Sequence, residues 1–242
     1  FRWMLKGQTY VVMDAPPDKE PCEPFVKIAE VLLKARVRVP EILAQDLDRG
    51  FLVLSDFGDI HYQEAIEGKG RDNLYELALG EILKLQTGLR KEAKVLPDYN
   101  EEWVRMELEI FREWCLPDFS QDEYEKVTTL LVDTFLEQPK VFVHRDFHCR
   151  NLLVLPDGNP GVIDFQGALH GPLTYDTVSL LRDCYVENDE DWIASKALDH
   201  KSRLVESGIL PNELSDEAFL RWFDFTGLQR HLKCIGIFHR LK

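Results

Sequence analysis

The residues of this sequence with the clearest chemical potential lie between positions 144 and 165. Two carboxylates, Asp146 and Asp164, each end a short apolar run, and Asn151 lies between them. If a turn brings the second run back beside the first, the three side chains converge on one small volume. Two oxygen ligands, completed by waters and phosphate oxygens, suit Mg²⁺, and a further carboxylate can orient a hydroxyl group and accept its proton. The pattern predicts a site for phosphoryl transfer, in which positioning and charge neutralisation provide most of the catalysis.

The prediction rests on Asp146, Asn151 and Asp164 together, because either aspartate alone is more often a turn former or a helix cap. The order His144-x-Asp146-x-x-x-x-Asn151, with Asp164 after a second apolar run, seldom arises by chance. The carboxylates could also serve a metal-dependent hydrolase. The chain lacks the repeated His and Asp ligands of such sites, which argues against that function.

Three short β-prone runs must hold these side chains in place. They lie at residues 141–143, 152–155 and 162–163, with a proline- and glycine-containing turn at 156–160 between the last two. A β-hairpin is therefore predicted beside the carboxylates. Apolar residues at helical spacing surround this hairpin and predict helices at about 72–89, 101–114, 122–137 and across most of 174–239.

The helix expected at 101–114 carries a stripe of large apolar side chains. An apolar stripe at helical spacing usually faces the core, so we expect this face to be buried. The stripe consists of Trp103, Met106, Ile110, Phe111 and Trp114.

The first sixty residues have mixed α and β character. Residues 8–13 are a short β-prone run, and apolar residues from 25 to 33 predict a helix that ends before Val39-Pro40. Residues 51–54 are a continuous apolar run, which predicts a central strand of a sheet.

The character of the chain changes near residues 55–60, where a polar turn follows the last of these strands. Everything after this turn is predominantly helical in pattern. We therefore expect a small β-containing lobe at residues 1–58 and a larger helical lobe at residues 59–242.

The segment at 143–151, together with Ile163-Asp164-Phe165, resembles the catalytic and metal-binding loops of the protein-kinase-like superfamily. His148 stands where many protein kinases have a lysine, and small-molecule kinases of the aminoglycoside phosphotransferase family often have a second histidine there. The chain is thus similar to this family. The resemblance implies an α+β, bilobal protein-kinase-like fold with a small β-containing N-lobe and a larger helical C-lobe.

More of the chain resembles one branch of that family, the bacterial cell-wall sugar kinases of peptidoglycan recycling. These enzymes phosphorylate the anomeric hydroxyl of N-acetylmuramate and N-acetylglucosamine, so the resemblance implies an ATP-dependent sugar kinase that uses ATP and Mg²⁺. The stretch at 227–233, Gly-Leu-Gln-Arg-His-Leu-Lys, is the most specific match to this branch. Further matching stretches lie at residues 12–17, 43–46, 163–172, 175–176 and 179–183.

By this resemblance, Asp146 is the catalytic base or hydroxyl-orienting carboxylate. Asn151 and Asp164 would hold Mg²⁺ that bridges the phosphates of ATP. Asp176 resembles a buried helix residue that braces the catalytic loop by hydrogen bonds. The residues that support the loop would be His144, His148 and Asp176.

The two substrates would bind on either side of this loop. The run Leu54, Ser55, Asp56 and Phe57 resembles the interlobe hinge, where backbone groups hydrogen-bond adenine. An N-acetylated sugar needs hydrogen-bonding groups, and a sugar carboxylate favours an arginine that can form two parallel bonds. The candidates for sugar binding near Asp146 and on the C-terminal helices are Arg182, Asp183, Arg230 and His231.

Two features of the superfamily are missing. A protein-kinase-like N-lobe has a lysine on its third strand, but residues 10–14 have no lysine at the expected place. Arg2, Lys6 or a residue before Phe1 could supply this charge. No glycine-rich phosphate loop is visible. Since the first residues resemble the middle of a strand, we expect that chain precedes Phe1 and that the loop lies there.

Composition limits the partners. The net charge of −14 argues against nucleic acid and anionic membranes as partners, and no apolar run is long enough to span a bilayer. The five cysteines are scattered and form no C-x-x-C pair, so neither a zinc site nor a disulfide framework is expected. These observations favour a reducing cytoplasm, with a small sugar and ATP as the partners, and they leave the oligomeric state open.

Two other functions remain open. One is phosphate transfer to an aminoglycoside, choline-like or homoserine-like acceptor. The net charge permits the acidic pocket that a cationic acceptor needs, although the match at 227–233 argues against it. The other is an inactive nucleotide-binding protein, which the missing strand lysine favours and the presence of Asp146, Asn151 and Asp164 opposes.

Overall fold

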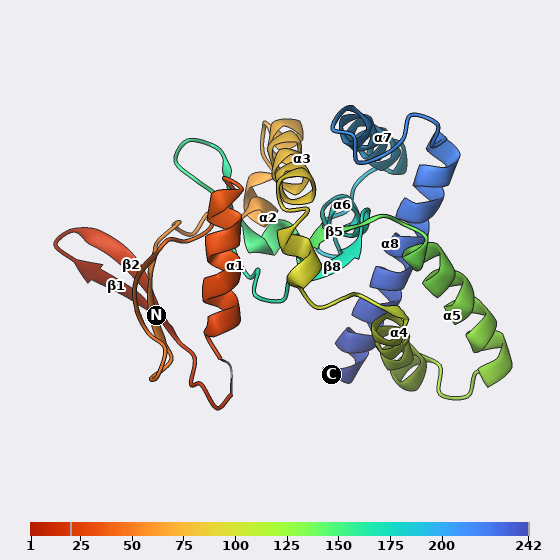
Figure 1. Ribbon diagram of the computed structural model, residues 1–242, viewed down its shortest axis with the longest axis horizontal. Coiled ribbons are helices and arrows are strands. Elements are labelled where there is room, and N and C mark those ends of the chain that lie inside the picture. Colours follow the sequence, from red (N-terminus) through yellow and green to blue (C-terminus); the bar gives the residue numbers. More distant parts are fainter. Residues whose placement is uncertain (20, 242) are drawn as a thin grey trace.

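The computed structural model describes residues 1–19 and 21–241 and combines a small sheet-containing part with a larger helical part (Figure 1). This is the α+β class that the sequence predicts. The N-terminal elements are β1 (Arg2–Leu5), β2 (Gln8–Asp14), α1 (Glu23–Lys34), β3 (Ile42–Asp46) and β4 (Phe51–Ser55). They are followed by α2 (Tyr62–Ala65), α3 (Arg71–Gly88), η1 (Glu92–Val95), α4 (Glu101–Cys115), α5 (Gln121–Leu136), β5 (Lys140–Val143), η2 (Cys149–Asn151), β6 (Leu152–Val154), β7 (Pro160–Val162), β8 (Leu169–Pro172), α6 (Tyr175–Leu181), α7 (Glu190–Glu206) and α8 (Asp216–Arg240).

The N-terminal sheet is antiparallel throughout, in the order β1-β2-β4-β3. β4 lies inside the sheet, which confirms the prediction of a central strand. Its Leu52 and Leu54 are buried and alternate with half-buried residues, because successive side chains of a strand point to opposite faces. The register places Val11 of β2 opposite Leu54.

Helix α1 connects the sheet-containing part to the helical part. Its buried residues recur at the three- and four-residue spacing of one helix face, from Phe25 to Leu32, and Pro24 lies in its first turn, where the missing N–H costs nothing. Phe25 stacks on Phe165 with the ring centroids 4.6 Å apart. The helix therefore packs directly against the residue that follows Asp164.

The short strands of the helical part pair differently from the expectation. β6 and β7 form the predicted hairpin, but β5 pairs with β8. The expectation that the strand before Asp164 lies directly beside the strand before Asp146 is wrong, because β8 occupies that place. Leu-His-Gly-Pro lacks the β-branched residues that mark a strand. Its glycine, Gly171, packs tightly, because an added Cβ would come within 3.2 Å of Tyr99 and Val143.

Helix α8 packs against four other helices of the helical part, α4, α5, α6 and α7. Its closest approach is to α4, where a Cβ added to Gly236 would lie only 2.7 Å from the backbone nitrogen of Phe111. A glycine there lets the two helix backbones cross in contact.

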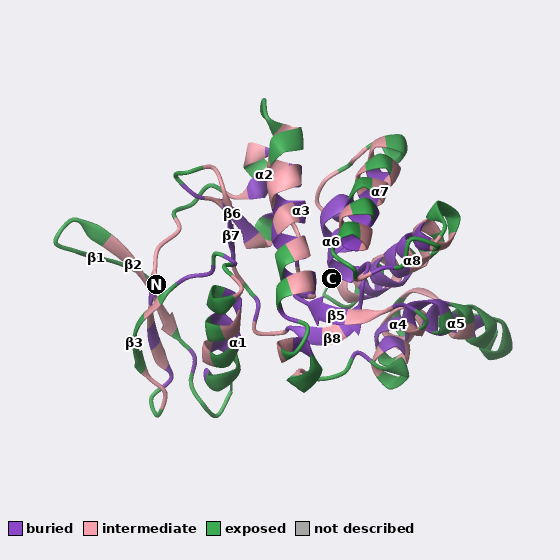
Figure 2. Cartoon of the chain, turned by 45° about the horizontal axis from the view of Figure 1, so that its top comes forward, coloured by how far each residue is buried: buried purple, intermediate pink, exposed green. Residues whose placement is uncertain are grey.

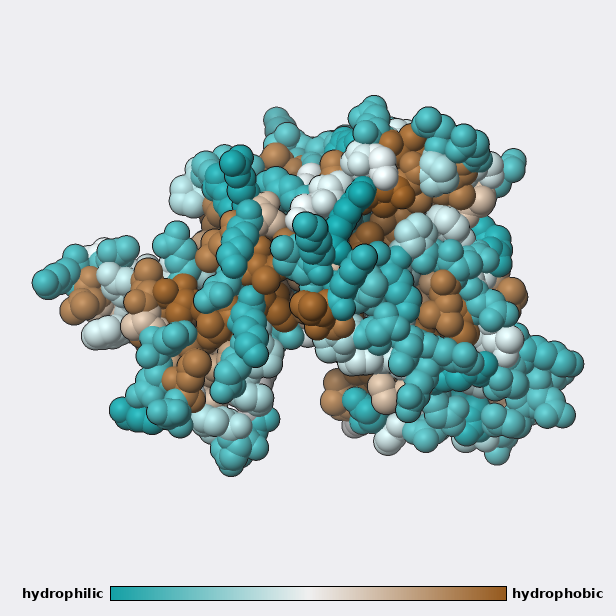
Figure 3. All heavy atoms as spheres, in the orientation of Figure 1, coloured by the Kyte–Doolittle hydropathy of each residue, from teal (hydrophilic) through white to brown (hydrophobic). Residues whose placement is uncertain are grey.

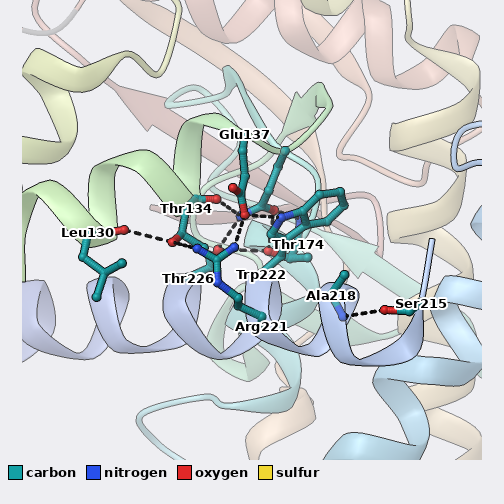
Figure 4. A network of polar contacts seen from close by, with 10 residues as sticks. Leu130, Thr134, Glu137, Thr174, Ser215, Ala218, Arg221, Trp222 and Thr226 are labelled. Atoms are coloured by element: carbon teal, nitrogen blue, oxygen red, sulfur yellow. Dashed lines mark hydrogen bonds and ion pairs between the residues drawn. The ribbon is translucent and has the colours of Figure 1, made fainter.

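Polar contacts join α8 to the neighbouring elements at its other end (Figure 4). Arg221 and Trp222 both donate to Glu137, which follows α5, and the Trp222 Nε1 bond is 2.6 Å long. Thr174, just before α6, donates to the Thr226 hydroxyl at 3.0 Å. This network fixes α8 against α5 and α6.

Buried residues continue from the sheet into the helical part (Figure 2). Helix α4 departs from the expectation, because Met106 and Trp114 of its apolar stripe are 56% and 48% exposed whereas Glu107 is buried. The prediction of a buried stripe was wrong because the face that carries Glu107 is turned toward Lys233 of α8. Within the described residues, no helix is both long and apolar enough to cross a membrane.

Candidate active site

The structure brings Asp146, Asn151 and Asp164 together. The Asn151 side-chain amide donates to the backbone carbonyl of Asp146 at 2.9 Å and to the Asp164 carboxylate at 3.2 Å. Gln166 donates to the other oxygen of Asp164 at 2.8 Å. The convergence thus arises through Asn151, which lies on η2 between the two loops.

The donor set of Asn151 and Asp164 fits Mg²⁺. The amide nitrogen of Asn151 is used within the protein, which leaves its oxygen as a ligand next to the exposed Asp164 carboxylate. Two oxygen ligands are typical of Mg²⁺ sites, where waters and phosphate oxygens complete the octahedron. No cluster of three or more His, Cys, Asp or Glu side chains suited to another metal occurs among the described residues.

The loop that carries Asp146 is braced by Asp176. This buried carboxylate accepts the backbone N–H groups of His144 and Arg145 at 2.7 and 3.0 Å. Arg145 has a φ of 80°, a strained conformation for a residue with a side chain, so the loop needs such support. Burial raises the pKa of Asp176 to about 7, against the effect of its two backbone hydrogen bonds.

His144 supports the same loop from its other side. Its Nε2–H donates to the carbonyl of Ile163 at 3.1 Å, which ties the loop to the residue before Asp164. Burial lowers the pKa of His144 to about 4, so the ring is neutral at pH 7.

A second buried acid, Glu107 of α4, ties the loop to α8. It accepts from Lys233 at 2.7 Å, from Gln229 at 3.0 Å and from Arg145 at 3.2 Å. Burial opposes its ionisation, but the charge of Lys233 and the hydrogen bonds from Lys233, Tyr99 and Gln229 together lower the pKa of Glu107. Arg230 completes the arrangement by donating to the carbonyl of Arg145 at 3.0 Å.

A cleft of about 340 Å³ lies between the sheet and the helical part. Asp164 lines this cleft together with all four predicted hinge residues, Leu54, Ser55, Asp56 and Phe57. On the face seen in Figure 3, hydrophobic side chains gather where these two parts meet. The hinge packs closely on β7, since a Cβ at Gly161 would lie 2.5 Å from the Phe57 ring.

Strand β2 has no lysine. Val11 lines the cleft, and Met13 lies two residues further on the same face of the strand. Of the two basic candidates, Arg2 lines the cleft but pairs with Asp56 at 2.7 Å. Lys6 is exposed in the turn between β1 and β2.

A second pocket, of about 150 Å³, lies beside Asp146. It is built from the catalytic loop, the segment after α6 and one face of α8. Arg230 lines it and stacks over Tyr175, with the guanidinium 4.6 Å from the ring centroid. His148 also lines it, and burial lowers the pKa of this ring. Asp183 holds the loop end nearby by accepting the backbone N–H of Cys149 at 2.8 Å.

Arg182 and His231 do not line this pocket in the described chain. Arg182 forms ion pairs with Glu190 and Asp224 at 2.8 and 2.9 Å, and His231 donates to the Arg182 carbonyl at 2.9 Å. Of the four residues predicted to bind the sugar, Asp183 and Arg230 line the pocket beside Asp146, and Arg182 and His231 do not.

Sequence reasoning missed several residues of the pocket. Lys233, Cys234 and Ile237 line it together with the predicted Arg230, and the spacing of these four is that of one helix face, which was a usable signal. The contributions of Cys184 and Tyr185 had no such signal, because they lie in an irregular segment.

The chain is similar to known phosphotransferases over most of its length. The model of the phosphotransferase enzyme family matches residues 1–201. The N-acetylmuramate/N-acetylglucosamine kinase of Pseudomonas aeruginosa is 45% identical over 249 aligned residues, covering 100% of this chain and 72% of that protein. The enzyme of the same name from Neisseria meningitidis is 40% identical, covering 97% of this chain and 72% of that protein.

Solved structures show the same fold at low sequence identity. A Plasmodium vivax ethanolamine kinase has a TM-score of 0.64 at 14% identity, covering 94% of this chain and 69% of that one. An aminoglycoside-3′-phosphotransferase of type VIII has a TM-score of 0.57 at 18% identity, covering 93% and 87%. These structures establish the protein-kinase-like fold that the catalytic-loop motif predicts.

Proposed function

Because the chain belongs to the phosphotransferase enzyme family, we propose that it transfers the terminal phosphate of ATP to the anomeric hydroxyl of N-acetylmuramate or N-acetylglucosamine. Membership of this family makes it a kinase that uses ATP. The names of its relatives support the sugar acceptor. The anomeric position, the role of Mg²⁺, a cytoplasmic location and the roles of the individual residues are part of the proposal.

One observation carries the mechanism. Asp164 lines the larger cleft, Asp146 lines the smaller pocket, and Asn151 hydrogen-bonds both residues. A nucleotide in the cleft and an acceptor in the pocket would therefore meet at these three residues. We propose that residues 1–58 and 59–242 act as two lobes around this meeting point.

In the transfer step, the Asp146 carboxylate orients the acceptor hydroxyl and takes its proton. A bond forms between the acceptor oxygen and the terminal phosphorus, and the bond from that phosphorus to the bridging oxygen of ADP breaks. Asn151 and Asp164 would hold Mg²⁺, which neutralises charge on the phosphates when bound. Asp176 and His144 keep the loop in position and do not react.

Arg230 and Lys233 favour an acceptor that carries hydroxyl, amide or carboxylate groups. Both line the pocket beside Asp146, and a carboxylate can accept two hydrogen bonds from an arginine. The same two cations disfavour a cationic acceptor, although the net charge of the chain is −14. An aminoglycoside or choline-like acceptor is therefore the second candidate.

A panel of acceptors distinguishes these candidates. Release of ADP would be measured with N-acetylmuramate, N-acetylglucosamine, an aminoglycoside and choline, and the phosphate position would be read by phosphorus NMR. We expect activity with the two amino sugars and an anomeric phosphate. Activity only with cationic acceptors, or phosphate on the 6-hydroxyl, would defeat the acceptor assignment and leave the kinase assignment standing. Absence of any ADP release would favour the inactive nucleotide-binding protein.

The role of Arg230 has its own test. Arg230→Lys keeps the charge but loses the parallel pair of donors. We expect KM for the sugar to rise about tenfold or more while KM for ATP changes less than about twofold. Because Arg230 also donates to the carbonyl of Arg145, kcat should fall as well. Arg182→Lys is the matched control, since Arg182 lies outside the pocket, and it should leave both KM values near those of the unmodified protein.

A further inference from the structure

Two cysteines line the pocket beside Asp146, although they come from different elements. Cys184 lies in the segment between α6 and α7, and Cys234 lies on α8. The two cysteines line the same pocket of about 150 Å³, and their thiols interact there. Cys184 is exposed and Cys234 is half-buried, so solutes in the pocket can reach them.

The charges around Cys234 favour its thiolate. Arg230 and Lys233 line the same pocket, and His231 lies on the same helix. The hydrogen bond from Cys184 and these three basic groups lower the pKa of Cys234 to about 6 despite partial burial. The same hydrogen bond and burial raise the pKa of Cys184. Because Cys234 follows Lys233 on α8 and lies one helical turn from Arg230 in the same pocket, we take Cys234 as the nucleophile of the pair and Cys184 as the proton donor.

The pocket also contains groups that oppose this assignment and must be weighed. Asp146 and Asp183 carry negative charge, and His148 and Tyr185 are neutral at pH 7. Lys233 already pairs with Glu107, but within the described chain Arg230 forms no ion pair with a carboxylate. A buried guanidinium without such a partner is well placed to stabilise a thiolate.

The other cysteines lack this environment. Cys22 and Cys149 are buried, and burial raises the pKa of Cys149. Cys115 is half-buried at the end of α4, away from the pocket. Reaction with a dissolved disulfide should thus be confined to the pair in the pocket.

We propose that Cys234 and Cys184 are a redox-sensitive modification site, at which a low-molecular-weight disulfide such as oxidised glutathione links the two residues across the acceptor pocket and stops phosphate transfer. The inference about transfer rests on the proposed function, but the thiol chemistry does not. Since the ATP cleft and this pocket share no lining residue, the modification acts on the acceptor side.

The chemistry balances in two exchanges. The Cys234 thiolate attacks one sulfur of the small disulfide, forms a mixed disulfide and expels one small thiolate. Cys184 loses its proton and attacks the Cys234 sulfur of the mixed disulfide, which expels the second small thiolate. The protein pair is oxidised by two electrons, and the small disulfide is reduced to two thiols. The product has lost the negative charge beside Arg230 and joins α8 to the segment after α6.

To test this proposal, the full chain is treated with oxidised glutathione at pH 7 and then with dithiothreitol. After each step, peptide mapping by mass spectrometry locates the disulfides, and sugar phosphorylation and ATP binding are measured. We expect a Cys184–Cys234 disulfide, a loss of sugar phosphorylation of about tenfold or more, ATP binding within about twofold, and recovery on reduction. A disulfide at other cysteines, no reaction at all, or a Cys184–Cys234 disulfide with unchanged phosphorylation would overturn the proposal.

Variants separate the two roles. Cys184→Ala should stop at a mixed disulfide on Cys234, and Cys234→Ser should not react, each compared with its own reduced activity. Cys115→Ser is the matched control and should react like the unmodified protein. Alkylation by iodoacetamide should show a midpoint near pH 6 at Cys234, and Cys184→Ala should move it upward. If the reduced protein phosphorylates no sugar, the proposed function fails, while the peptide map and alkylation still decide the thiol pair.

Discussion

The larger cleft and the loop that carries Asp146 are held by different kinds of interaction. At the cleft, Arg2 pairs with Asp56 and Asp59, and the side chains of Arg2, Asp56 and Asp59 are 41%, 4% and 78% exposed. On the catalytic-loop side, Asp176 and Glu107 are only 1% and 2% exposed and accept several hydrogen bonds each.

This difference has a physical consequence. An exposed ion pair gains little over water, whereas removal of a buried hydrogen-bonding partner leaves groups that water cannot reach. The exposed pair of Arg2 and Asp59 at the larger cleft should therefore tolerate substitution. The catalytic loop should not, because it keeps Asp146 in one position.

The largest effect is expected at Asp146 itself. Asp146→Asn removes the group that accepts the proton, so kcat should fall by roughly 10²–10⁴-fold while ATP binding and the unfolding midpoint change little. Steady-state kinetics and calorimetric ATP titration measure these quantities. Asp164→Ala is the companion variant and should also weaken ATP binding in the presence of Mg²⁺. Near-normal turnover of Asp146→Asn would remove its assigned role.

The next effect is expected at the brace of the loop. Asp176→Ala leaves the N–H groups of His144 and Arg145 without an acceptor, which should lower the free energy of unfolding by about 3 kcal/mol and reduce kcat. Urea unfolding and kinetics provide the readouts. Asp224→Ala, at a more exposed partner of Arg182, is the control and should cost less than about 1 kcal/mol. Equal losses in the free energy of unfolding for Asp176→Ala and Asp224→Ala would contradict the expected difference between buried and exposed groups.

A smaller effect is expected from pH at a buried histidine far from the site. His200 of α7 is fully buried and shares a 2.9 Å hydrogen bond with Gln86 of α3. Burial lowers its pKa to about 3, below the value of about 6.5 in the unfolded chain, so its stabilising contribution is complete above pH 6.5 and is lost as the pH falls toward 3. At pH 5 the loss should be roughly 2 kcal/mol relative to pH 7.5.

Comparison of variants isolates this contribution from those of other titrating groups. His200→Gln should flatten the decrease in stability between pH 7.5 and 5, measured by urea unfolding. His239→Gln, at an exposed position on α8, should leave the decrease as it is. An unchanged slope in His200→Gln would show that the buried histidine is not the titrating group.

The smallest effect is expected at the larger cleft. Arg2→Ala should raise KM for ATP by less than about fivefold, and the difference should shrink as salt is added, because Arg2 and its partner Asp59 are exposed to solvent. Arg38→Ala removes another exposed pair, with Asp157, outside the ATP cleft, and should leave KM for ATP unchanged. A collapse of ATP binding in Arg2→Ala would instead identify Arg2 as the substitute for the missing strand lysine.

The sequence predicted best the features that depend on residues close together in the chain. The helices and the β6–β7 hairpin follow from apolar periodicity and turn residues, and the two loops with Asp146, Asn151 and Asp164 follow from polar residues at the ends of short strands. The four residues predicted to form a hinge, Leu54 to Phe57, all line the larger cleft with Asp164. These features need no knowledge of distant parts of the chain.

The sequence predicted worst where distant elements meet. β8 has little strand propensity and pairs with β5 because the surrounding fold places it there. The apolar stripe of α4 indicated a buried face, yet the helix buries Glu107, because Lys233 of α8 and Arg145 of the loop offset the cost of burying its charge.

By itself, the sequence predicted that Asp146, Asn151 and Asp164 come together, because they lie on short loops whose order along the chain places them near one another. Only the tertiary structure decided what surrounds them. Arg230 faces the pocket beside Asp146 whereas Arg182 and His231 do not, and Cys184 meets Cys234 there. The reason is that the rotation of α8 about its own axis is set by its packing against four other helices, which no local pattern in the sequence records.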